Sequence, residues 1–185
     1  EIQPIAIDDL LQRAPAELDR PAMLRLVEGR RVLITGAGGS IGGELVRQIA
    51  AMKPAQLNLI DNGEYALYAI DRELAENYPE VNRQAILADV RDAERINATV
   101  AATRPELVFH AAALKHVPVV EAHPIEGVRT NVLGTRNVAE ACRQNGVSCM
   151  VLISTEKVVD PTNVMGATKR LAECIAQAMD VAERS

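Results

Sequence analysis

Aromatic residues and long apolar runs are both scarce in this chain of 185 residues. Only 2% of the residues are aromatic and there is no tryptophan, so the base-stacking surfaces of single-strand nucleic-acid binders are not expected. No stretch free of acidic and basic residues exceeds twelve residues, as at 32–43 and 144–155. A membrane-spanning helix needs about 20 apolar residues. With a net charge of −5 and no basic run, nucleic-acid partners and membrane segments are not predicted.

Cysteine and histidine are also few and show no metal-binding spacing. The three cysteines, Cys142, Cys149 and Cys174, contain no C-x-x-C pair, and an odd number cannot all form disulfides. We expect reduced thiols in the core of a cytoplasmic protein. The three histidines have no neighbouring cysteine or acidic cluster, so no metal site is predicted. The first residues carry no secretory signal.

The remaining composition is that of a globular domain, with 48% hydrophobic and 24% charged residues. Short apolar runs, typical of strands, occur at 31–35, 56–60, 84–88, 107–110 and 148–154. Between and after them, apolar residues recur at helical spacing over 41–52, 64–76, 93–103, 128–145 and 164–182. Continuous apolar strands indicate burial on both faces. The alternation predicts an α/β fold, a doubly wound parallel sheet of five strands with helices on both faces.

A glycine-rich segment, T-G-A-G-G-S-I-G at 35–42, joins the first strand to the first helix of the sheet. We expect Gly36 to allow a tight turn, Gly39 to let the backbone approach a pyrophosphate, and Gly42 to permit close helix–strand packing. The helix start offers unpaired N–H groups to the anion. Asp61 lies nineteen residues after Gly42, the position of a ribose-binding acid. The alternative, an ordinary turn, does not account for Asp61.

The same acid bears on the choice of nucleotide. A carboxylate at Asp61 accepts hydrogen bonds from a ribose 2′-hydroxyl and repels a 2′-phosphate. No arginine or lysine occurs between Asp61 and Arg72 to bind that phosphate. The sequence therefore favours NAD over NADP.

The two ends differ from the middle of the chain. Residues 1–30 contain one short amphipathic stretch, at 7–12, and are interpreted as a lead-in that docks on a neighbouring element. Residues 31–185 are predicted to form a dinucleotide-binding domain. Such a fold usually has six strands and a substrate pocket built by further chain, so we expect a C-terminal substrate domain to be missing.

Five blocks of sequence carry a resemblance to one family. They are D-V-R-D at 89–92, H-A-A-A-L-K-H-V-P at 110–118, N-V-L-G-T at 131–135, S-T-E-K at 154–157 and P-T-N-V-M-G-A-T-K-R at 161–170. Together they resemble the CapD-like nucleoside-diphosphate-sugar 4,6-dehydratases of polysaccharide biosynthesis, extended short-chain dehydrogenases/reductases that act on UDP-N-acetylglucosamine. The resemblance runs over residues 5–173 and implies an NAD-dependent lyase with a UDP-sugar substrate. Many relatives carry membrane helices ahead of the segment corresponding to 1–30.

The resemblance also implies contacts to the cofactor. Asp89 and Val90 correspond to the adenine-binding pair, and Ala111 and Ala112 to the lining of the cofactor's middle. For Asp89, a cap on the following helix is nearly as well supported. Further cofactor contacts are implied at Ser40, Ile41 and Ser154.

The catalytic pattern departs from most of the superfamily, which uses Tyr-x-x-x-Lys. Here Met165 holds the tyrosine position, and Lys169 lies four residues on, on the same helix face. A thioether cannot accept a proton, but the family commonly carries methionine there. Lys169 is expected to bind the ribose hydroxyls of the nicotinamide half rather than to be a solvated helix lysine. His110 and His116 are interpreted as a packing residue and a loop residue.

A dehydratase also needs an acid and a base. The resemblance assigns the base at sugar C5 to Lys157, the acid at the C6 hydroxyl to Glu156, and sugar positioning to Thr155. The family usually has aspartate where this chain has Glu156, one methylene longer, which changes the reach of the carboxylate. The alternative is an exposed Glu–Lys pair in a loop.

The sequence also permits two functions other than a 4,6-dehydratase. A UDP-sugar 4-epimerase shares the cofactor and the first oxidation but normally depends on the absent tyrosine. A non-catalytic NAD-binding module would keep Gly36, Gly39 and Asp61 without needing Glu156 or Lys157. Homo-oligomers are common in the superfamily. We expect residues 1–185 alone to bind NAD without converting a UDP-sugar.

Overall fold

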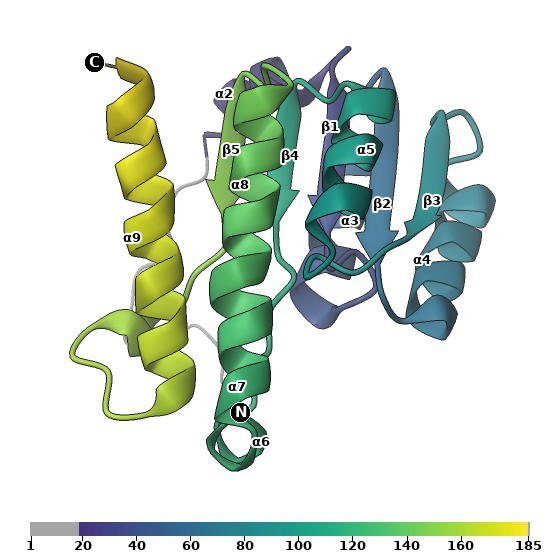
Figure 1. Ribbon diagram of the computed structural model, residues 1–185. Helices are drawn as coiled ribbons and strands as arrows, with labels where there is room; N and C mark the ends of the chain where they lie inside the picture. The colour runs from purple at the N-terminus through teal and green to yellow at the C-terminus, as the bar shows by residue number, and fades with distance from the viewer. Residues whose placement is uncertain (1–18, 185) are drawn as a thin grey trace, which may run out of the picture.

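The computed structural model describes residues 19–184, which form one parallel sheet with helices on both faces (Figure 1). Its strands, in the spatial order β3-β2-β1-β4-β5, are β1 (Arg31–Thr35), β2 (Gln56–Asp61), β3 (Arg83–Leu87), β4 (Leu107–His110) and β5 (Cys149–Leu152). The predicted fold class is confirmed. The fifth strand is shorter at both ends than the expected 148–154, and the side chains of β5, at one edge of the sheet, are only partly buried.

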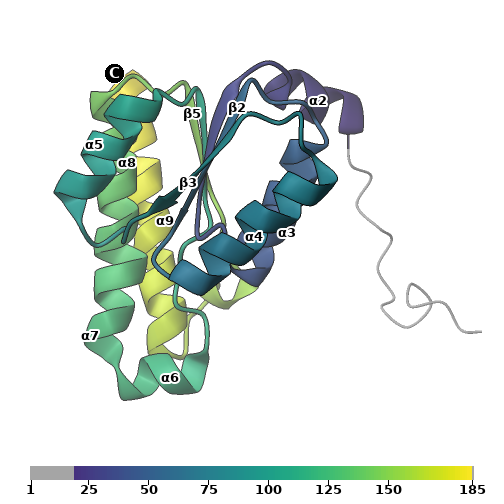
Figure 2. The same cartoon turned by 90° about the vertical axis from the view of Figure 1, so that its right-hand side faces the viewer.

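The helices lie in two layers (Figure 2). One face of the sheet is covered by α2 (Arg20–Val27), α3 (Ser40–Ala50) and α4 (Glu64–Asn77). The other is covered by α5 (Ala93–Thr103), α8 (Thr135–Gln144) and α9 (Val164–Arg184). The helices expected at 41–52, 64–76, 93–103 and 164–182 are all present, with ends shifted by no more than a few residues. The amphipathic stretch at 7–12 lies outside the described residues, and α2 was not expected.

The helix expected over 128–145 is the end of a longer succession of helices. It is preceded by α6 (Val117–Ala122) and α7 (Pro124–Gly127), and its first half, η1 (Val128–Gly134), is a π-helix. Prolines at the starts of α6 and α7 fit a first helical turn, where no backbone N–H is needed. His123, directly before Pro124, is held away from helical geometry at φ −133°. That break separates α6 from α7.

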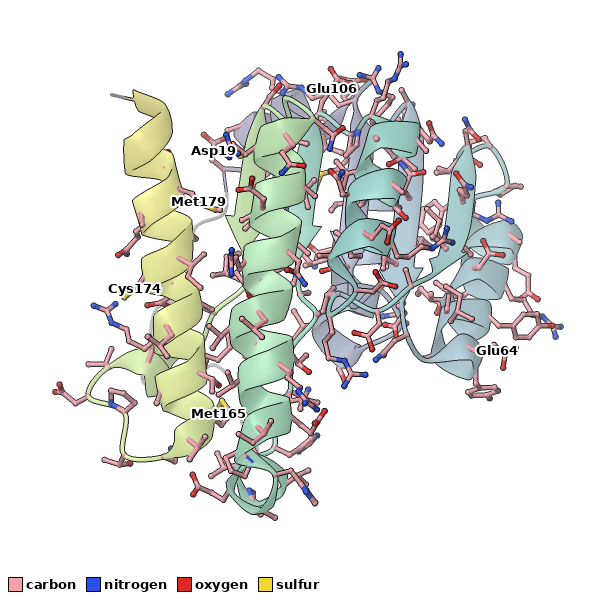
Figure 3. The ribbon with its side chains drawn as sticks, viewed as in Figure 1. Asp19, Glu64, Glu106, Met165, Cys174 and Met179 are labelled. Atoms are coloured by element: carbon pink, nitrogen blue, oxygen red, sulfur yellow. The ribbon has the colours of Figure 1, made fainter. Side chains whose placement is uncertain are left out.

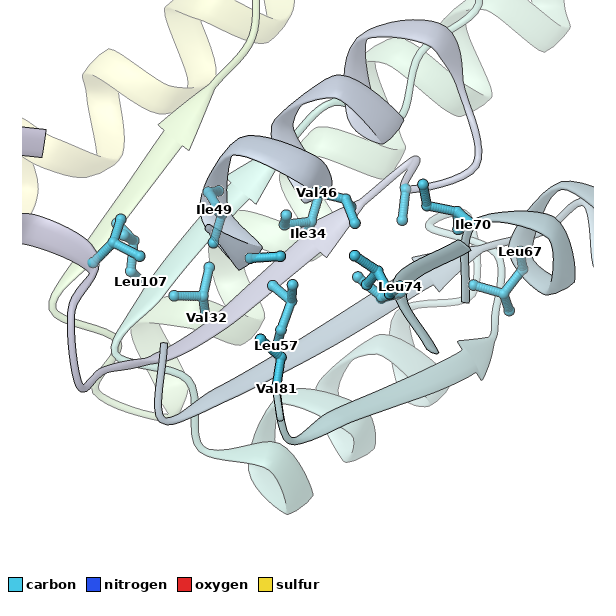
Figure 4. Packing of buried hydrophobic residues seen from close by; sticks show 14 residues of the cluster. Val32, Ile34, Val46, Ile49, Leu57, Leu67, Ile70, Leu74, Val81 and Leu107 are labelled. Atoms are coloured by element: carbon cyan, nitrogen blue, oxygen red, sulfur yellow. The ribbon is translucent and has the colours of Figure 1, made fainter. Parts of the chain in front are cut away.

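Two apolar cores fix the sheet between the layers. Alternate residues of β1 point to opposite faces, so Val32 and Ile34 pack against α3 and α4 (Figure 4), whereas Leu33 packs toward α5 and α8. Val27 of α2 belongs to the first of these cores. Burying a side chain of this size contributes about 1.5–3 kcal/mol. Because a shift of one residue would exchange the two faces, this packing sets the register that aligns the strand ends.

Two remaining expectations concern membrane helices and the cysteines. No helix within residues 19–184 is long and apolar enough to cross a membrane. Cys142 is buried and Cys149 partly buried, but Cys174 is exposed on α9 (Figure 3). The expectation that all three cysteines are core thiols is therefore wrong for Cys174.

Candidate functional site

The loop between β1 and α3 lies against the loop that follows β4. Gly36 has a φ of +69°, and a Cβ there would lie 2.6 Å from the backbone nitrogen of Ala112. Gly36 therefore meets two constraints that exclude a side chain, a left-handed conformation and a close backbone contact. A Cβ on Gly42 would overlap the carbonyl oxygen of Gly36. The expected role of Gly42 is corrected in detail: it packs α3 on the loop carbonyl rather than on a strand.

The start of α3 is open to a ligand. Gly39 is its N-cap and provides no side-chain hydrogen bond to the first turn. A Cβ on Gly39 would approach only the carbonyl oxygen of Gly36, at 3.3 Å, so its other side is free of protein atoms within 4 Å. The first-turn N–H groups at Ser40 and Ile41 therefore provide donors and the positive end of a helix dipole. This arrangement fits the phosphates of a dinucleotide.

Two cavities meet over this loop. The first, of about 470 Å³, contains two aspartates and is called the carboxylate cavity; among its lining residues are Asp61, Asn62, Asp89, Val90, Arg91, Ala112 and Glu126. The second, of about 480 Å³, is called the lysine cavity and is lined by Ser40, Ile41, Gly42, Lys115, Ile153, Ser154, Thr155, Glu156, Lys157, Met165 and Lys169, among others. Four residues line both: Gly36, Gly39, Ala111 and Ala113. Every site residue expected from the sequence lines one of these cavities.

In the carboxylate cavity, Asp61 is held by the backbone on both sides. Its Oδ2 accepts a hydrogen bond from the N–H of Gly38 at 2.9 Å, and its Oδ1 from that of Gly63 at 2.8 Å. The carboxylate is thereby oriented at the end of β2, with lone pairs left for a ligand. Gly38 was not expected to matter, but a Cβ there would lie 2.6 Å from the Cβ of Ala66.

Asp89 is an ion-pair residue and not a helix cap. The carboxylate that caps α5 belongs to Asp92, which accepts from the N–H of Arg95 at 2.9 Å, so the capping alternative for Asp89 is wrong. Asp89 instead accepts from the backbone N–H of Arg91 and from its guanidinium, both at 2.9 Å. The hydrogen bond to that guanidinium is the largest cause that lowers the pKa of Asp89.

Arg91 extends this network across the carboxylate cavity. A second guanidinium nitrogen of Arg91 donates to Glu126 of α7 at 2.9 Å, and Asn62 donates to Asp89 at 3.3 Å. The sequence pattern includes Arg91 in a family block without indicating its role, and Asn62 and Glu126 lie outside all five blocks. Glu126 is 35 residues from Arg91, so no local pattern could have linked them. Val90 is buried, and a Cβ on Gly134 of the π-helix would lie 2.7 Å from one of its methyl groups.

In the lysine cavity, Lys169 is a buried cation. Its side chain is only 6% exposed, and Nζ donates to the carbonyl oxygen of Ile153 at 2.6 Å. Burial lowers the pKa of Lys169, and the nearby charge of Glu173 acts in the opposite sense. The reading of Lys169 as a solvated helix lysine is therefore wrong. Met165, one turn earlier at the start of α9, is also buried and lines the same cavity (Figure 3).

Thr155, Glu156 and Lys157 surround the start of a short 3-10 helix, η2 (Glu156–Val158). The Glu156 carboxylate accepts from the hydroxyl of Thr155 at 2.8 Å and from the Lys157 ammonium at 3.0 Å. These hydrogen bonds, Lys157 first, lower the pKa of Glu156 to about 2. Its side chain is 81% exposed. The trio is thus both an exposed Glu–Lys pair and part of the cavity wall, as the two sequence interpretations allowed.

Ser154, His116 and His110 are the remaining residues singled out from the sequence. The hydroxyl of Ser154 donates to Glu173 at 2.6 Å, and Glu173 also accepts from Arg170. His116 is exposed at the N-cap of α6. His110 is buried at the end of β4 between two threonines. Lys115 lines the lysine cavity and was given no role from the sequence. Within the described part of the chain, no group of three histidine, cysteine or acidic residues is placed to bind a metal ion.

This strand order, with a glycine-rich first loop and an acid at the end of β2, defines a doubly wound α/β fold of the Rossmann type. The chain belongs to the polysaccharide biosynthesis protein family, whose sequence profile matches residues 32–185. The family resemblance inferred from the five blocks is confirmed.

Individual relatives agree with this assignment. The capsular polysaccharide biosynthesis protein CapD of Staphylococcus aureus is 43% identical over 180 residues, which are 97% of this chain and 30% of that protein. A UDP-N-acetylglucosamine 4,6-dehydratase (inverting) of Campylobacter jejuni is 36% identical over 145 residues, 78% of this chain and 42% of the relative. Other relatives bear the name UDP-glucose 4-epimerase. The chain thus spans less than half the length of these relatives.

Solved structures show the same fold. MoeE5, determined in complex with UDP-glucose and NAD, superimposes with a TM-score of 0.66 at 28% identity, over 80% of this chain and 48% of that one. The relatives named above and this structural neighbour include sugar-nucleotide dehydratases and epimerases and a protein that binds a UDP-sugar together with NAD.

Proposed function

We propose that this chain binds NAD across its two cavities. The adenosine half would lie in the carboxylate cavity, with the ribose on Asp61 and the adenine beside Asp89 and Val90. The pyrophosphate would lie over Gly39 and the start of α3, and the nicotinamide ribose beside Lys169. The support is geometric: Gly39 presents no Cβ to a ligand that approaches the loop, and the open first turn of α3 offers donors to an anion. The NAD in the MoeE5 structure is consistent with it.

The chemistry supplied by a bound NAD is acceptance of a hydride from sugar C4 and its return to C6. The reaction we propose is the 4,6-dehydration of a nucleoside-diphosphate N-acetylhexosamine, UDP-N-acetylglucosamine being the first candidate. The observation that carries it is the placement of Thr155, Glu156 and Lys157 in the same cavity as Lys169. A proton donor and acceptor next to the hydride-transfer position is what elimination requires beyond simple oxidation.

The proposed roles of these three side chains follow from their contacts. Lys157 removes the C5 proton once it has lost its own, and Thr155 orients the sugar. Glu156 is ionised in the free protein because its pKa is lowered to about 2. It therefore receives a proton before it can donate one to the departing C6 hydroxyl. The proton it receives is the one released from the C4 hydroxyl when C4 is oxidised, and Lys157, 3.0 Å away, returns its proton to C5 after the hydride reaches C6.

A 4-epimerase is the second candidate, since relatives of that name match the chain. It would return the hydride to C4 and would need a group to accept the proton of the C4 hydroxyl. The tyrosine that normally does this is replaced by Met165, which is buried in the cavity wall and has no proton to exchange. Both reactions begin by removing that proton, so the absent tyrosine does not separate them; Glu156 and Lys157 in the same cavity, which an epimerase does not need, favour the dehydratase. A purely NAD-binding module remains the third outcome and would show no sugar conversion.

The test uses the complete polypeptide encoded by the gene that contains this chain. Incubated with UDP-N-acetylglucosamine, it should give a product lighter by one water, detected by mass spectrometry. Lys157→Met should abolish both this product and deuterium exchange from solvent into C5. Lys53→Met, an exposed lysine outside both cavities, is the matched control and should change neither.

Recovery of the C4 epimer without loss of water would replace the dehydratase with the epimerase. Absence of any sugar conversion while NAD still binds would favour the binding module. Residues 1–185 alone should bind NAD without forming product, because remote groups of the substrate are needed to orient the reacting carbon.

A further inference from the structure

Outside the lining of the two cavities lies a line of buried polar side chains, joined at one point through a backbone carbonyl, that the proposed chemistry does not use. It connects β1, β4, α8, the π-helix η1 and α9 through Thr35, His110, Thr135, Asn131 and Thr168, each no more than 2% exposed. Buried polar groups require hydrogen-bond partners, and no buried side-chain nitrogen or oxygen in the described residues lacks one. The line is therefore a complete set of paired donors and acceptors.

The direction of each hydrogen bond at the α9 end is fixed by chemistry. The hydroxyl of Thr168 donates to the carbonyl oxygen of Met165 at 2.7 Å, so it can only accept from the Asn131 amide at 2.9 Å. Likewise the hydroxyl of Thr135 donates to the carbonyl oxygen of Asn131 at 2.7 Å. A hydroxyl has one proton, and both of these protons are already used.

These directions determine the state of His110. Its Nε2 lies 3.0 Å from the hydroxyl oxygen of Thr135, and because that hydroxyl proton is engaged, Nε2 must be the donor. Its Nδ1 lies 2.6 Å from the hydroxyl oxygen of Thr35, which also accepts from the N–H of Ala112 at 3.4 Å. In a neutral ring Nδ1 is then the acceptor. The imidazole is held as the neutral Nε2–H tautomer.

Both ends of this line reach the proposed cofactor site. At one end, Ala112 is the residue whose backbone excludes a side chain from Gly36. At the other, Met165 and Lys169 line the lysine cavity from the first turns of α9. Asn131 also forms two hydrogen bonds with the backbone of Leu114, at 2.8 and 2.9 Å, which fasten the loop after β4 to the same line.

We propose that His110 is a positioning residue: as the Nε2–H tautomer, it holds the start of α9, with Met165 and Lys169, in register with the glycine loop. Thr135 is fastened to the backbone of Asn131, whose side-chain amide bonds Thr168 of α9, so loss of one junction should move α9 relative to Gly36. An apolar side chain could fill the same space but would form no directional hydrogen bonds to Thr35 and Thr135. Burial and the nearby Lys169 charge, which lower the pKa of His110 to about 3, keep the ring neutral and agree with this assignment.

The first experiment measures the tautomer in the unaltered chain by ¹⁵N NMR of its imidazole rings. We expect one ring to show a protonated Nε2 and a bare Nδ1, unchanged between about pH 5 and 8. Assignment comes from loss of that signal in His110→Gln. An Nδ1–H form, or a His110 ring that titrates in this range, would overturn the proposal.

The second experiment breaks the junction between His110 and α9. Thr135→Val removes the hydroxyl at nearly constant volume, and Thr135→Ser, the matched control, keeps it. With methyl-labelled methionine, Thr135→Val should move the Met165 methyl resonance and leave that of Met52, two residues beyond the end of α3, in place. The same variant should weaken NAD binding about fivefold to tenfold, equivalent to one hydrogen bond, whereas Thr135→Ser should stay within about twofold of the unaltered chain.

The unchanged Met52 signal verifies that Thr135→Val is folded. If that variant leaves both the Met165 signal and NAD affinity as in Thr135→Ser, the line does not position α9 and the proposal is wrong. Should Thr135→Val fail to fold, the tautomer measurement decides alone. The inference goes beyond the proposed function: if NAD does not bind at all, the tautomer and the Met165 shift still test it.

Discussion

The carboxylate cavity and the lysine cavity differ in how far their charged groups are hydrogen-bonded within the protein. In the carboxylate cavity, Asp61 and Asp89 already have their hydrogen-bond partners, from backbone N–H groups and Arg91. In the lysine cavity, Lys169 has one carbonyl partner, and Lys115 has no hydrogen bond or ion pair to any residue of 19–184. The acceptors of the carboxylate cavity are therefore held in place before a ligand binds. The ammonium groups of Lys169 and Lys115 in the lysine cavity are still available to a ligand.

This difference matches what each half of the ligand would require. Recognition of adenosine needs acceptors in fixed positions, and fixing them in advance lowers the ordering cost of binding. Binding the nicotinamide ribose needs a donor that is not fully used within the protein, and Lys169 has a single carbonyl partner. Substitutions in the carboxylate cavity should therefore alter the preference for NAD over NADP. Substitutions in the lysine cavity should alter how NAD affinity depends on pH.

The largest effect is expected where the cavities meet. Gly36→Ala would place a Cβ 2.6 Å from the nitrogen of Ala112 in addition to the strain of φ +69°. Gly146→Ala is the matched control, with φ +65° and no atom within 4 Å of the added Cβ. Both should lose about 1–2 kcal/mol from backbone strain. Only Gly36→Ala should lose more stability and abolish NAD binding in calorimetric titration; normal NAD affinity in that variant would refute this account of the loop.

Lys169→Met should come next. Loss of a charged hydrogen-bond donor should weaken NAD binding by about 2 kcal/mol, roughly thirtyfold. The free energy of unfolding should change by less than about 1 kcal/mol, because removing a desolvated charge offsets the lost bond to Ile153. Since burial lowers the pKa of Lys169 from its usual 10.5, its positive charge is lost at a lower pH than in an ordinary lysine.

That lowered pKa gives a pH test. NAD affinity should fall as pH rises toward 10, earlier than for an exposed lysine, and Lys169→Met should remove this dependence. Lys157→Met keeps the buried cation and should retain the dependence. A pH profile that is the same in the unaltered chain and in Lys169→Met would contradict a role for this ammonium.

Asp61→Ala should have a smaller and more selective effect. NAD affinity should fall by about tenfold for the lost ribose contacts, whereas NADP affinity should hold or rise because the like charge is removed. Asp71→Ala, which breaks an ion pair with Arg83 outside both cavities, should leave the ratio unchanged. Equal affinity for both nucleotides in the unaltered chain would show that Asp61 does not select between them.

The smallest effect is expected for Glu126→Gln. Arg91 would keep its hydrogen bonds to Asp89, and partly exposed ion pairs contribute less than about 1 kcal/mol. Unfolding by denaturant should therefore change little, and NAD affinity should change by about twofold. A loss as large as that of Asp61→Ala would mean that the Arg91–Glu126 contact, and not the aspartate, organises the carboxylate cavity.

The sequence was sufficient to predict most of the fold because the apolar periodicity reports burial directly. Buried strands such as Arg31–Thr35 and helices such as Ala93–Thr103 have the predicted bounds. The succession of α6, α7 and the π-helix was missed, since prolines and irregular hydrogen bonding interrupt a pattern that otherwise reads as one helix. The cysteine expectation failed at Cys174 because a helix of mixed composition exposes one of its faces.

Within the site, sequence spacing predicts residues such as Gly36 and Asp61, because their roles depend on the backbone close to them in the chain. It could not locate contacts made over long distances in the chain, such as Arg91 with Glu126 or His110 with Thr135. These depend on which elements the topology brings together. The same limit applied to Glu156, where the pattern gave the carboxylate but not the two hydrogen bonds that keep it ionised.

The most direct test of a ligand spanning both cavities is methyl NMR of Met165, which lines only the lysine cavity. The methionine-labelled chain is titrated with AMP, which would fill the carboxylate cavity alone, and then with NAD, and Met165→Leu identifies the signal. We predict that AMP leaves the Met165 methyl resonance in place and that NAD shifts it. No response to NAD, or an equal response to AMP, would contradict the assignment of the two cavities to the two halves of one dinucleotide.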